Sequence, residues 1–134
     1  MWQIYDFQKK SRSVIQTWLD DEEISKSGRG KLNQKLDMLR QLGPDLPPKV
    51  LAGPLSSRDR KLKSKNTYKL IIHAEKMLRP FLCKGPIDNE NEYTMLMGAI
   101  EKGGRLDHDP AEAEDIRLQV IEDPGRRMPN ERYR

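Results

Sequence analysis

Three short apolar segments stand out along this chain, at residues 68–72, 77–83 and 93–100. Each is rich in β-branched, aromatic or other large apolar residues and lacks a helical period. Charged residues or glycine, asparagine and proline bound each of them, which is typical of strands. We therefore expect neighbouring strands of one antiparallel sheet. A weak alternation over residues 2–7 predicts a further strand at an edge of that sheet.

Apolar residues at helical spacing predict three helices, over residues 9–20, 29–42 and 110–121. Ser11 or Ser13 can cap the first helix, Gly43-Pro44 ends the second, and Asp109-Pro110 begins the third. The apolar stripes are Val14, Ile15, Trp18 and Leu19 in the first helix, Leu32, Leu36, Leu39 and Leu42 in the second, and Ala113, Ile116 and Val120 in the third.

The order of these elements predicts an α+β fold. We expect a small antiparallel sheet of three to four strands, with two N-terminal helices packed on one face and a C-terminal helix. Residues 1–121 would form this single domain, and residues 122–134 a polar tail that stays mobile unless a partner orders it.

Length and composition agree with one domain, since the chain has 134 residues of which 35% are hydrophobic. No apolar run approaches the roughly 20 residues of a membrane helix, and the first residues do not resemble a signal peptide. The one cysteine, Cys83, excludes an internal disulfide. These features favour a cytoplasmic protein that does not enter a membrane.

Positive charge is concentrated between residues 58 and 84, where nine cations face only Asp59 and Glu75. The net charge of the whole chain is +4, so the rest of it is slightly acidic. Such a basic block is typical of phosphate binding, although a face kept charged for solubility fits the charge equally well. The cations are Arg58, Arg60, Lys61, Lys63, Lys65, Lys69, Lys76, Arg79 and Lys84.

The succession of local strings along residues 2–120 resembles the phage-derived branch of the RelE/HigB toxin superfamily. The matching strings are residues 2–19, 39–44, 48–50, 53–55, 68–70, 78–81 and 96–102, followed by Pro110 leading into a helix with Ala113. The resemblance implies a RelE/ParE-like fold. It also implies a toxin of a type II toxin–antitoxin pair that cuts mRNA, commonly on the ribosome, without a metal or another cofactor.

In that class a ribose 2′-OH attacks the adjacent phosphate. This reaction needs a group to take the 2′ proton, cations for the phosphoryl oxygens and a donor for the leaving oxygen. The resemblance assigns the catalytic roles to Lys69, Arg79, Lys102, Arg105 and His108. The remaining basic residues, Arg58, Arg60, Lys61, Lys63, Lys65, Lys76 and Lys84, would bind the nucleic acid. The implied partners are a cognate antitoxin, mRNA and the ribosome.

Two positions depart from the pattern of that branch. Met97 stands where a histidine is usual, and Glu101 precedes Lys102 where two lysines are usual. Both favour an alternative, a catalytically inactive relative whose basic face binds a nucleic acid or an acidic protein. A third hypothesis is a ParE-like inhibitor of DNA gyrase. Two histidines and one cysteine at these spacings predict no metal site.

Overall fold

The computed structural model describes residues 1–57, 62 and 65–134. In these residues the helices are α1 (Val14–Asp21), α2 (Lys26–Leu42) and α3 (Pro110–Glu122), with short 3-10 turns η1 (Gly43–Asp45) and η2 (Pro124–Arg126). The strands are β1 (Gln3–Lys9), β2 (Arg12–Ser13), β3 (Leu51–Ala52), β4 (Tyr68–Leu70), β5 (Ile72–His73), β6 (Met77–Leu78), β7 (Phe81–Lys84), β8 (Glu92–Met97), β9 (Ile100–Lys102), β10 (Arg105–Leu106) and β11 (Arg127–Pro129).

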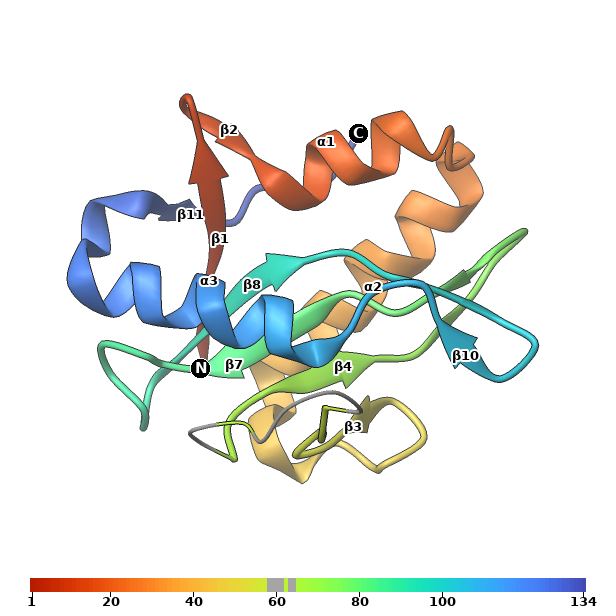
Figure 1. The fold of residues 1–134 in the computed structure, drawn as a ribbon. Coiled ribbons are helices and arrows are strands. Elements are labelled where there is room, and N and C mark those ends of the chain that lie inside the picture. Colours follow the sequence, from red (N-terminus) through yellow and green to blue (C-terminus); the bar gives the residue numbers. More distant parts are fainter. Residues whose placement is uncertain (58–61, 63–64) are drawn as a thin grey trace.

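The larger sheet has the strand order β11-β1-β8-β7-β4-β3, and β2 pairs with the end of β1. It is mixed, because β1 runs parallel to β8 while its other neighbours pair antiparallel. A second sheet has the order β10-β9-β6-β5. Figure 1 shows β8, β7 and β4 across the middle of the molecule, with β1, the neighbour of β8, rising from the N-terminus toward β2.

The expectation of one small antiparallel sheet of three to four strands is wrong. Each of the three predicted strands breaks and is divided between the two sheets, at Ile71, at Arg79-Pro80 and at Gly98-Ala99. Proline has no N–H for a sheet ladder, and glycine weakens a strand interior, so two of these breaks have a local cause. In addition, β1 lies inside the larger sheet and not at its edge.

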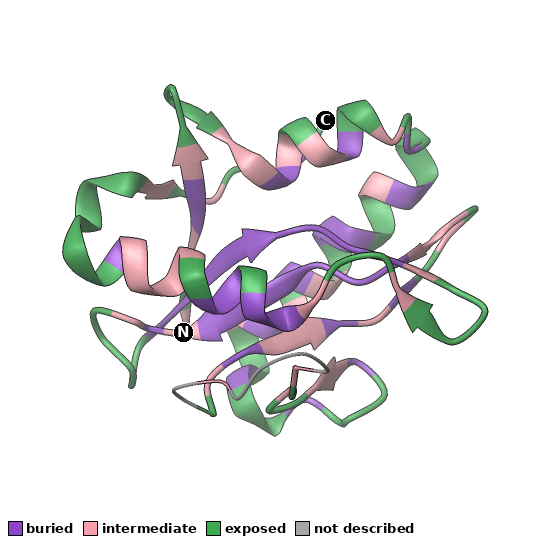
Figure 2. Cartoon of the chain, in the orientation of Figure 1, coloured by how far each residue is buried: buried purple, intermediate pink, exposed green. Residues whose placement is uncertain are grey.

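The helices also lie on both faces of the larger sheet and not on one (Figure 1). Alternate residues of β7 explain this, because Leu82 packs into a cluster with α1 and α2 while Phe81 and Cys83 pack into a cluster with Ala113 of α3. The strands are therefore buried on both faces, as the continuous buried colour of β7 and β8 in Figure 2 shows.

The predicted C-terminal ends of the three helices lie within one residue of the observed ones. The predicted start of the first helix is wrong, because residues 9–13 form the end of β1, a turn and β2, and α1 begins only at Val14. Helix α2 begins three residues before its predicted start. The side chain of Ser13 accepts a hydrogen bond from the backbone N–H of Gln16 at the start of α1. Asp109 caps α3 in a capping box with Glu112, and Pro110 occupies the first turn. These local signals fix where the connecting segments leave the helices.

Residues 122–134, for which the sequence predicts a mobile tail, pack against the domain. Strand β11 pairs with β1, and the Tyr133 side chain is 5% exposed. The Tyr133 hydroxyl donates to Asp6, and its backbone N–H donates to Asn33. One aromatic residue in a polar segment has no periodicity, which is why the sequence pattern does not indicate this contact.

No helix in the described part of the chain combines the length and the apolarity needed to cross a bilayer.

Gly98, which directly follows β8, packs closely against Trp18. A Cβ at this position would overlap the indole ring of Trp18, which has no flexible end to move aside. We expect Gly98→Ala to lower the free energy of unfolding by about 1–3 kcal/mol through overpacking, measured by urea denaturation.

Gly30 provides the matched control, because a Cβ there meets no atom within 4 Å and the residue lies in the exposed interior of α2. Gly30→Ala should raise the free energy of unfolding by about 0.5–1 kcal/mol. A loss of stability of the same size in both variants would contradict the close contact between Gly98 and Trp18.

Candidate functional site

The breaks in the three strand segments bring Lys69, Arg79 and Glu101 together. Lys69 lies on β4, Arg79 precedes β7 and Glu101 lies on β9. The Nζ atom of Lys69 is 3.9 Å from Oε1 of Glu101, and Nε of Arg79 is 3.5 Å from the same oxygen. One half-buried carboxylate is thus held between two cations from different segments of the chain.

Arg79 is nearly inaccessible, with 4% of the residue exposed. Its guanidinium donates to the backbone oxygens of Leu78 at 2.9 Å and Ile72 at 3.3 Å, and to Oε2 of Glu101 at 3.5 Å. The Arg79 guanidinium is therefore occupied by charge-assisted hydrogen bonds to groups of the protein itself. It can orient Glu101, but a bound molecule could not reach it.

A hollow of about 370 Å³ opens beside this carboxylate. The charged or titratable residues among its lining are Lys69, Glu101, Arg105 and His108. Arg105 follows the tight Gly103-Gly104 turn of the β9–β10 hairpin, and both glycines have the positive φ that such turns require. The rest of the lining is Leu55, Ser56, Gly104, Leu106 and Pro110.

The His108 side chain is 44% exposed at this hollow. Its Nδ1 atom lies 3.2 Å from both carboxylate oxygens of Glu112, one helical turn further along. A neighbouring carboxylate fixes the orientation of an imidazole. The hollow therefore combines a carboxylate, two cations and an oriented histidine, which are the groups needed to move protons next to a bound anion.

Of the five residues that the resemblance assigns to catalysis, Lys69, Arg105 and His108 line the hollow, and Arg79 contacts Glu101 from beneath. Lys102 is exposed but does not belong to the lining. Glu101 also lines the hollow, but the sequence indicated it only as a departure from the pattern of the resembled branch. It stands next to Lys102, directly after the predicted strand 93–100.

The remaining basic residues do not gather at this hollow. Lys76 pairs with Glu22, with Nζ and Oε2 2.8 Å apart. Lys84 lies 5.6 Å from the centre of the Trp2 ring, and Lys65 is exposed. Arg58, Arg60, Lys61 and Lys63 lie outside the described residues.

Neither a thiol nucleophile nor a metal cluster is found in the described residues. Cys83 is fully buried, and burial raises the pKa of its thiol to about 12. No group of three or more histidine, cysteine, aspartate and glutamate side chains is placed there to hold a metal ion.

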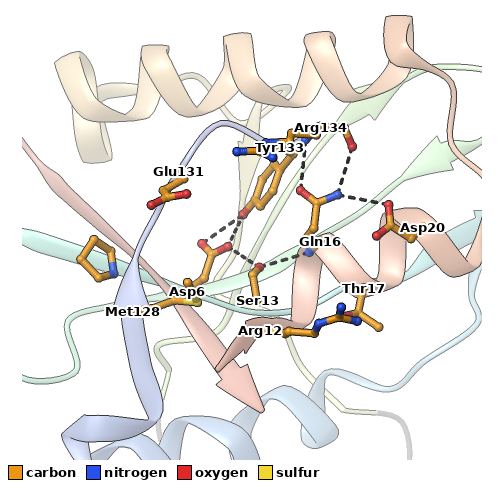
Figure 3. A pocket seen from close by; sticks show the side chains of 11 residues that line it. Asp6, Arg12, Ser13, Gln16, Thr17, Asp20, Met128, Glu131, Tyr133 and Arg134 are labelled. Atoms are coloured by element: carbon orange, nitrogen blue, oxygen red, sulfur yellow. Dashed lines mark hydrogen bonds between the residues drawn. The ribbon is translucent and has the colours of Figure 1, made fainter. Parts of the chain in front are cut away.

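A second hollow, of about 400 Å³, lies between α1 and the C-terminal segment (Figure 3). At its base the buried carboxylate of Asp6 accepts hydrogen bonds from the hydroxyls of Ser13 and Tyr133, as Figure 3 shows. The amide of Asn130 donates to the same carboxylate at 3.0 Å. Burial raises the pKa of Asp6, although these hydrogen bonds oppose the shift.

Both oxygens of Asp6 are thus occupied by groups of the fold itself, and only 1% of the residue is exposed. The network joins β1, the start of α1 and the C-terminal segment, so we assign it a structural role. The hollow beside Glu101 is the better candidate for chemistry, because its charged groups are accessible.

Comparisons of the chain with protein-family models, with curated proteins and with solved structures found no match.

The burial of Cys83 makes a direct prediction about its reactivity. The thiolate is the reactive form, so a buried thiol with a raised pKa should not react with iodoacetamide at pH 7.5 in the folded protein. Mass spectrometry should show full modification only after unfolding in urea. Rapid modification of the folded protein would show that this side chain is accessible.

Asp6 should impose a pH dependence on stability. Because its pKa is raised above the usual 3.8, the folded chain retains a proton that the unfolded chain has released at pH values just above 3.8. The contribution of Asp6 to stability therefore falls as pH rises through this window. Urea denaturation between pH 4 and 7 should show the native chain losing stability relative to Asp6→Asn.

Asp21→Asn, an exposed substitution of the same kind, controls for the loss of one charge. A native chain that gains stability relative to Asp6→Asn over the same pH range would contradict a raised pKa of Asp6.

Proposed function

We propose that this chain is a toxin of a type II toxin–antitoxin pair, acting as a metal-independent mRNA endoribonuclease on the ribosome. The observation that carries the proposal is the convergence of Lys69, Glu101, Arg105 and His108 on one hollow. The family resemblance of the sequence supports the same reaction class and supplies the expectation of an antitoxin.

In the proposed reaction the Glu101 carboxylate takes the proton of the ribose 2′-OH. The 2′ oxygen then forms a bond to the adjacent phosphorus while the bond from phosphorus to the 5′ oxygen breaks. His108, as imidazolium, donates the proton that the leaving 5′ oxygen needs. The products are a 2′,3′-cyclic phosphate and a 5′-hydroxyl end, and such proton transfers each contribute about 100-fold to 10,000-fold in rate.

The cations have two different tasks in this proposal. Lys69 and Arg105 can reach the hollow and neutralise the phosphoryl oxygens. Arg79 is a positioning residue, because it is buried and contacts the reacting atoms only through Glu101. Three cations surround the Glu101 carboxylate, so the net charge of the site remains positive. This positive charge favours phosphate binding even though Glu101 is negative.

In this proposal the antitoxin and the ribosome both act at the hollow beside Glu101. An antitoxin that blocks the enzyme would cover the hollow, and a carboxylate from it could take the place of the phosphate between Lys69 and Arg105. The ribosome would present the mRNA strand in an extended form that reaches the hollow.

One observation favours the second candidate, a non-catalytic binding module. Glu101 already pairs with Lys69 and Arg79, so the three side chains could form a purely structural ion-pair cluster. In that case the exposed cations would bind an anion without chemistry. The ParE-like inhibition of gyrase is the third candidate and is separated from the others by the experiment below.

Replacement of Glu101 by glutamine tests the proposed base. The amide keeps the size of the side chain but cannot take a proton, so cleavage should fall by about 100-fold or more. We would express the native and variant chains briefly in a bacterial host and map new transcript ends by primer extension. Glu122→Gln, at the exposed end of α3, is the matched control and should cleave like the native chain.

The outcomes distinguish the candidates. New ends in the native and Glu122→Gln strains that disappear with Glu101→Gln support the ribonuclease. Growth arrest with intact transcripts points to gyrase, and unchanged growth with intact transcripts points to a binding module. Replacing Arg79 would not separate an effect on catalysis from an effect on folding, because it also removes hydrogen bonds to the backbone.

A further inference from the structure

A third hollow, of about 410 Å³, carries positive charge without a compensating carboxylate. Its charged side chains are Lys31, Lys35 and Lys49, and none of the described residues that line it is acidic. His73 lies at its rim. The remaining lining residues are Gln34, Val50, Ile71 and Ile72. We call this feature the lysine groove.

The lysines of the groove are placed by two elements. Lys31 and Lys35 are one helical turn apart on α2, and Lys49 comes from the turn before β3. Nζ of Lys31 donates to the backbone oxygen of His73 at 3.0 Å, which ties the helix to the second sheet.

Lys35 and Lys49 are two of the lysines that form no ion pair in the described part of the chain. Within the described residues, no carboxylate lies within salt-bridge distance of either one, whereas Arg29, Arg40 and Lys76 each pair with an acidic side chain. Two uncompensated ammonium groups at one hollow leave a local positive potential for a bound anion.

The lysine groove and the hollow beside Glu101 are lined by residues that lie close together on the same two segments. Lys69 lines one hollow and Ile71 the other, so their Cα atoms are at most about 7 Å apart. On the neighbouring segment of the same chain, Val50 lines the lysine groove and Leu55 lines the hollow beside Glu101. The backbone N–H of Ile71 donates to the oxygen of Val50 at 2.9 Å, which holds the two segments together.

We propose that the lysine groove binds backbone phosphates of the same RNA strand that enters the hollow beside Glu101. This inference rests on the proposed ribonuclease function. A single strand carries one charge per nucleotide and can pass over the β3–β4 edge from one hollow to the next. Lys35 and Lys49 hold its phosphates as point charges, while Val50 and Ile71 give an apolar wall for sugar or base.

An acidic protein segment is the competing occupant. The observations favour RNA because residues only two apart on one segment, Lys69 and Ile71, line the hollow beside Glu101 and the groove, and a phosphate backbone offers regularly spaced charges to both. The two occupants differ in a measurable way, since RNA binding releases counterions in proportion to the phosphates that are neutralised.

The test uses a fluorescent single-stranded RNA in which every 2′-OH is methylated, so that the strand cannot be cleaved by attack of its own ribose. Anisotropy titrations at increasing KCl give the slope of log K against log salt. Loss of two phosphate contacts in the double variant Lys35→Gln, Lys49→Gln should reduce this slope by about 1.4, or about 0.7 per contact.

Two double variants serve as controls. Lys35→Arg, Lys49→Arg keeps both charges and should retain the native slope. Lys9→Gln, Lys10→Gln removes two exposed lysines from the β1–β2 turn and should change the slope by clearly less. Urea denaturation checks that all variants fold.

The inference is overturned if the native chain does not bind the RNA, if both glutamine variants lower the slope equally, or if poly-glutamate binds the groove more tightly than RNA does. Because the methylated strand cannot be cleaved, this result does not depend on catalysis. RNA binding through the groove together with intact transcripts in the expression experiment would refute the ribonuclease alone.

Discussion

The buried guanidinium of Arg79 is the constraint on which the arrangement of the site depends. A buried charge is costly unless it is fully paired, and Arg79 finds its partners on three segments of the second sheet: the carbonyls of Ile72 and Leu78 and the carboxylate of Glu101. Any shift of one segment relative to the others would leave part of the guanidinium unpaired. The side chain therefore fixes how β5, β6 and β9 meet, and with them the direction in which Glu101 faces.

The change of sheet at this point explains why charged residues gather there. A continuous strand would have carried Lys69 and Glu101 within one flat sheet, but the breaks at Ile71, Pro80 and Gly98 turn all three segments out of the larger sheet together. Backbone bonds follow the turn, since Arg79 donates to Ala99 and Leu70 donates to Pro80. The hollow beside Glu101 and the lysine groove are lined by residues near this bend, with Lys69 in the first and Ile71 in the second.

The sequence predicted the parts of the fold that depend on local signals. The caps at Ser13 and Asp109 are side-chain contacts within a few residues, so they can be read directly. The parallel pairing of β1 with β8, the division of the strands between two sheets and the burial of Tyr133 depend on contacts between distant segments. Lys69, Arg105 and His108 were named from the resemblance, but the role of Glu101 could not be inferred, because the cations around it come from other strands.

Asp6 and Glu101 both lie beside hollows, and a comparison of the two carboxylates shows why one suits structure and the other chemistry. Asp6 is surrounded by hydroxyl and amide donors and is 1% exposed, so its oxygens are used inside the fold, and burial raises its pKa. The Glu101 side chain is 28% exposed and faces cations at 3.5 and 3.9 Å, distances that leave its oxygens able to accept another donor. A proton acceptor must be reachable by its substrate and held in one orientation. Only Glu101 of this pair meets both conditions.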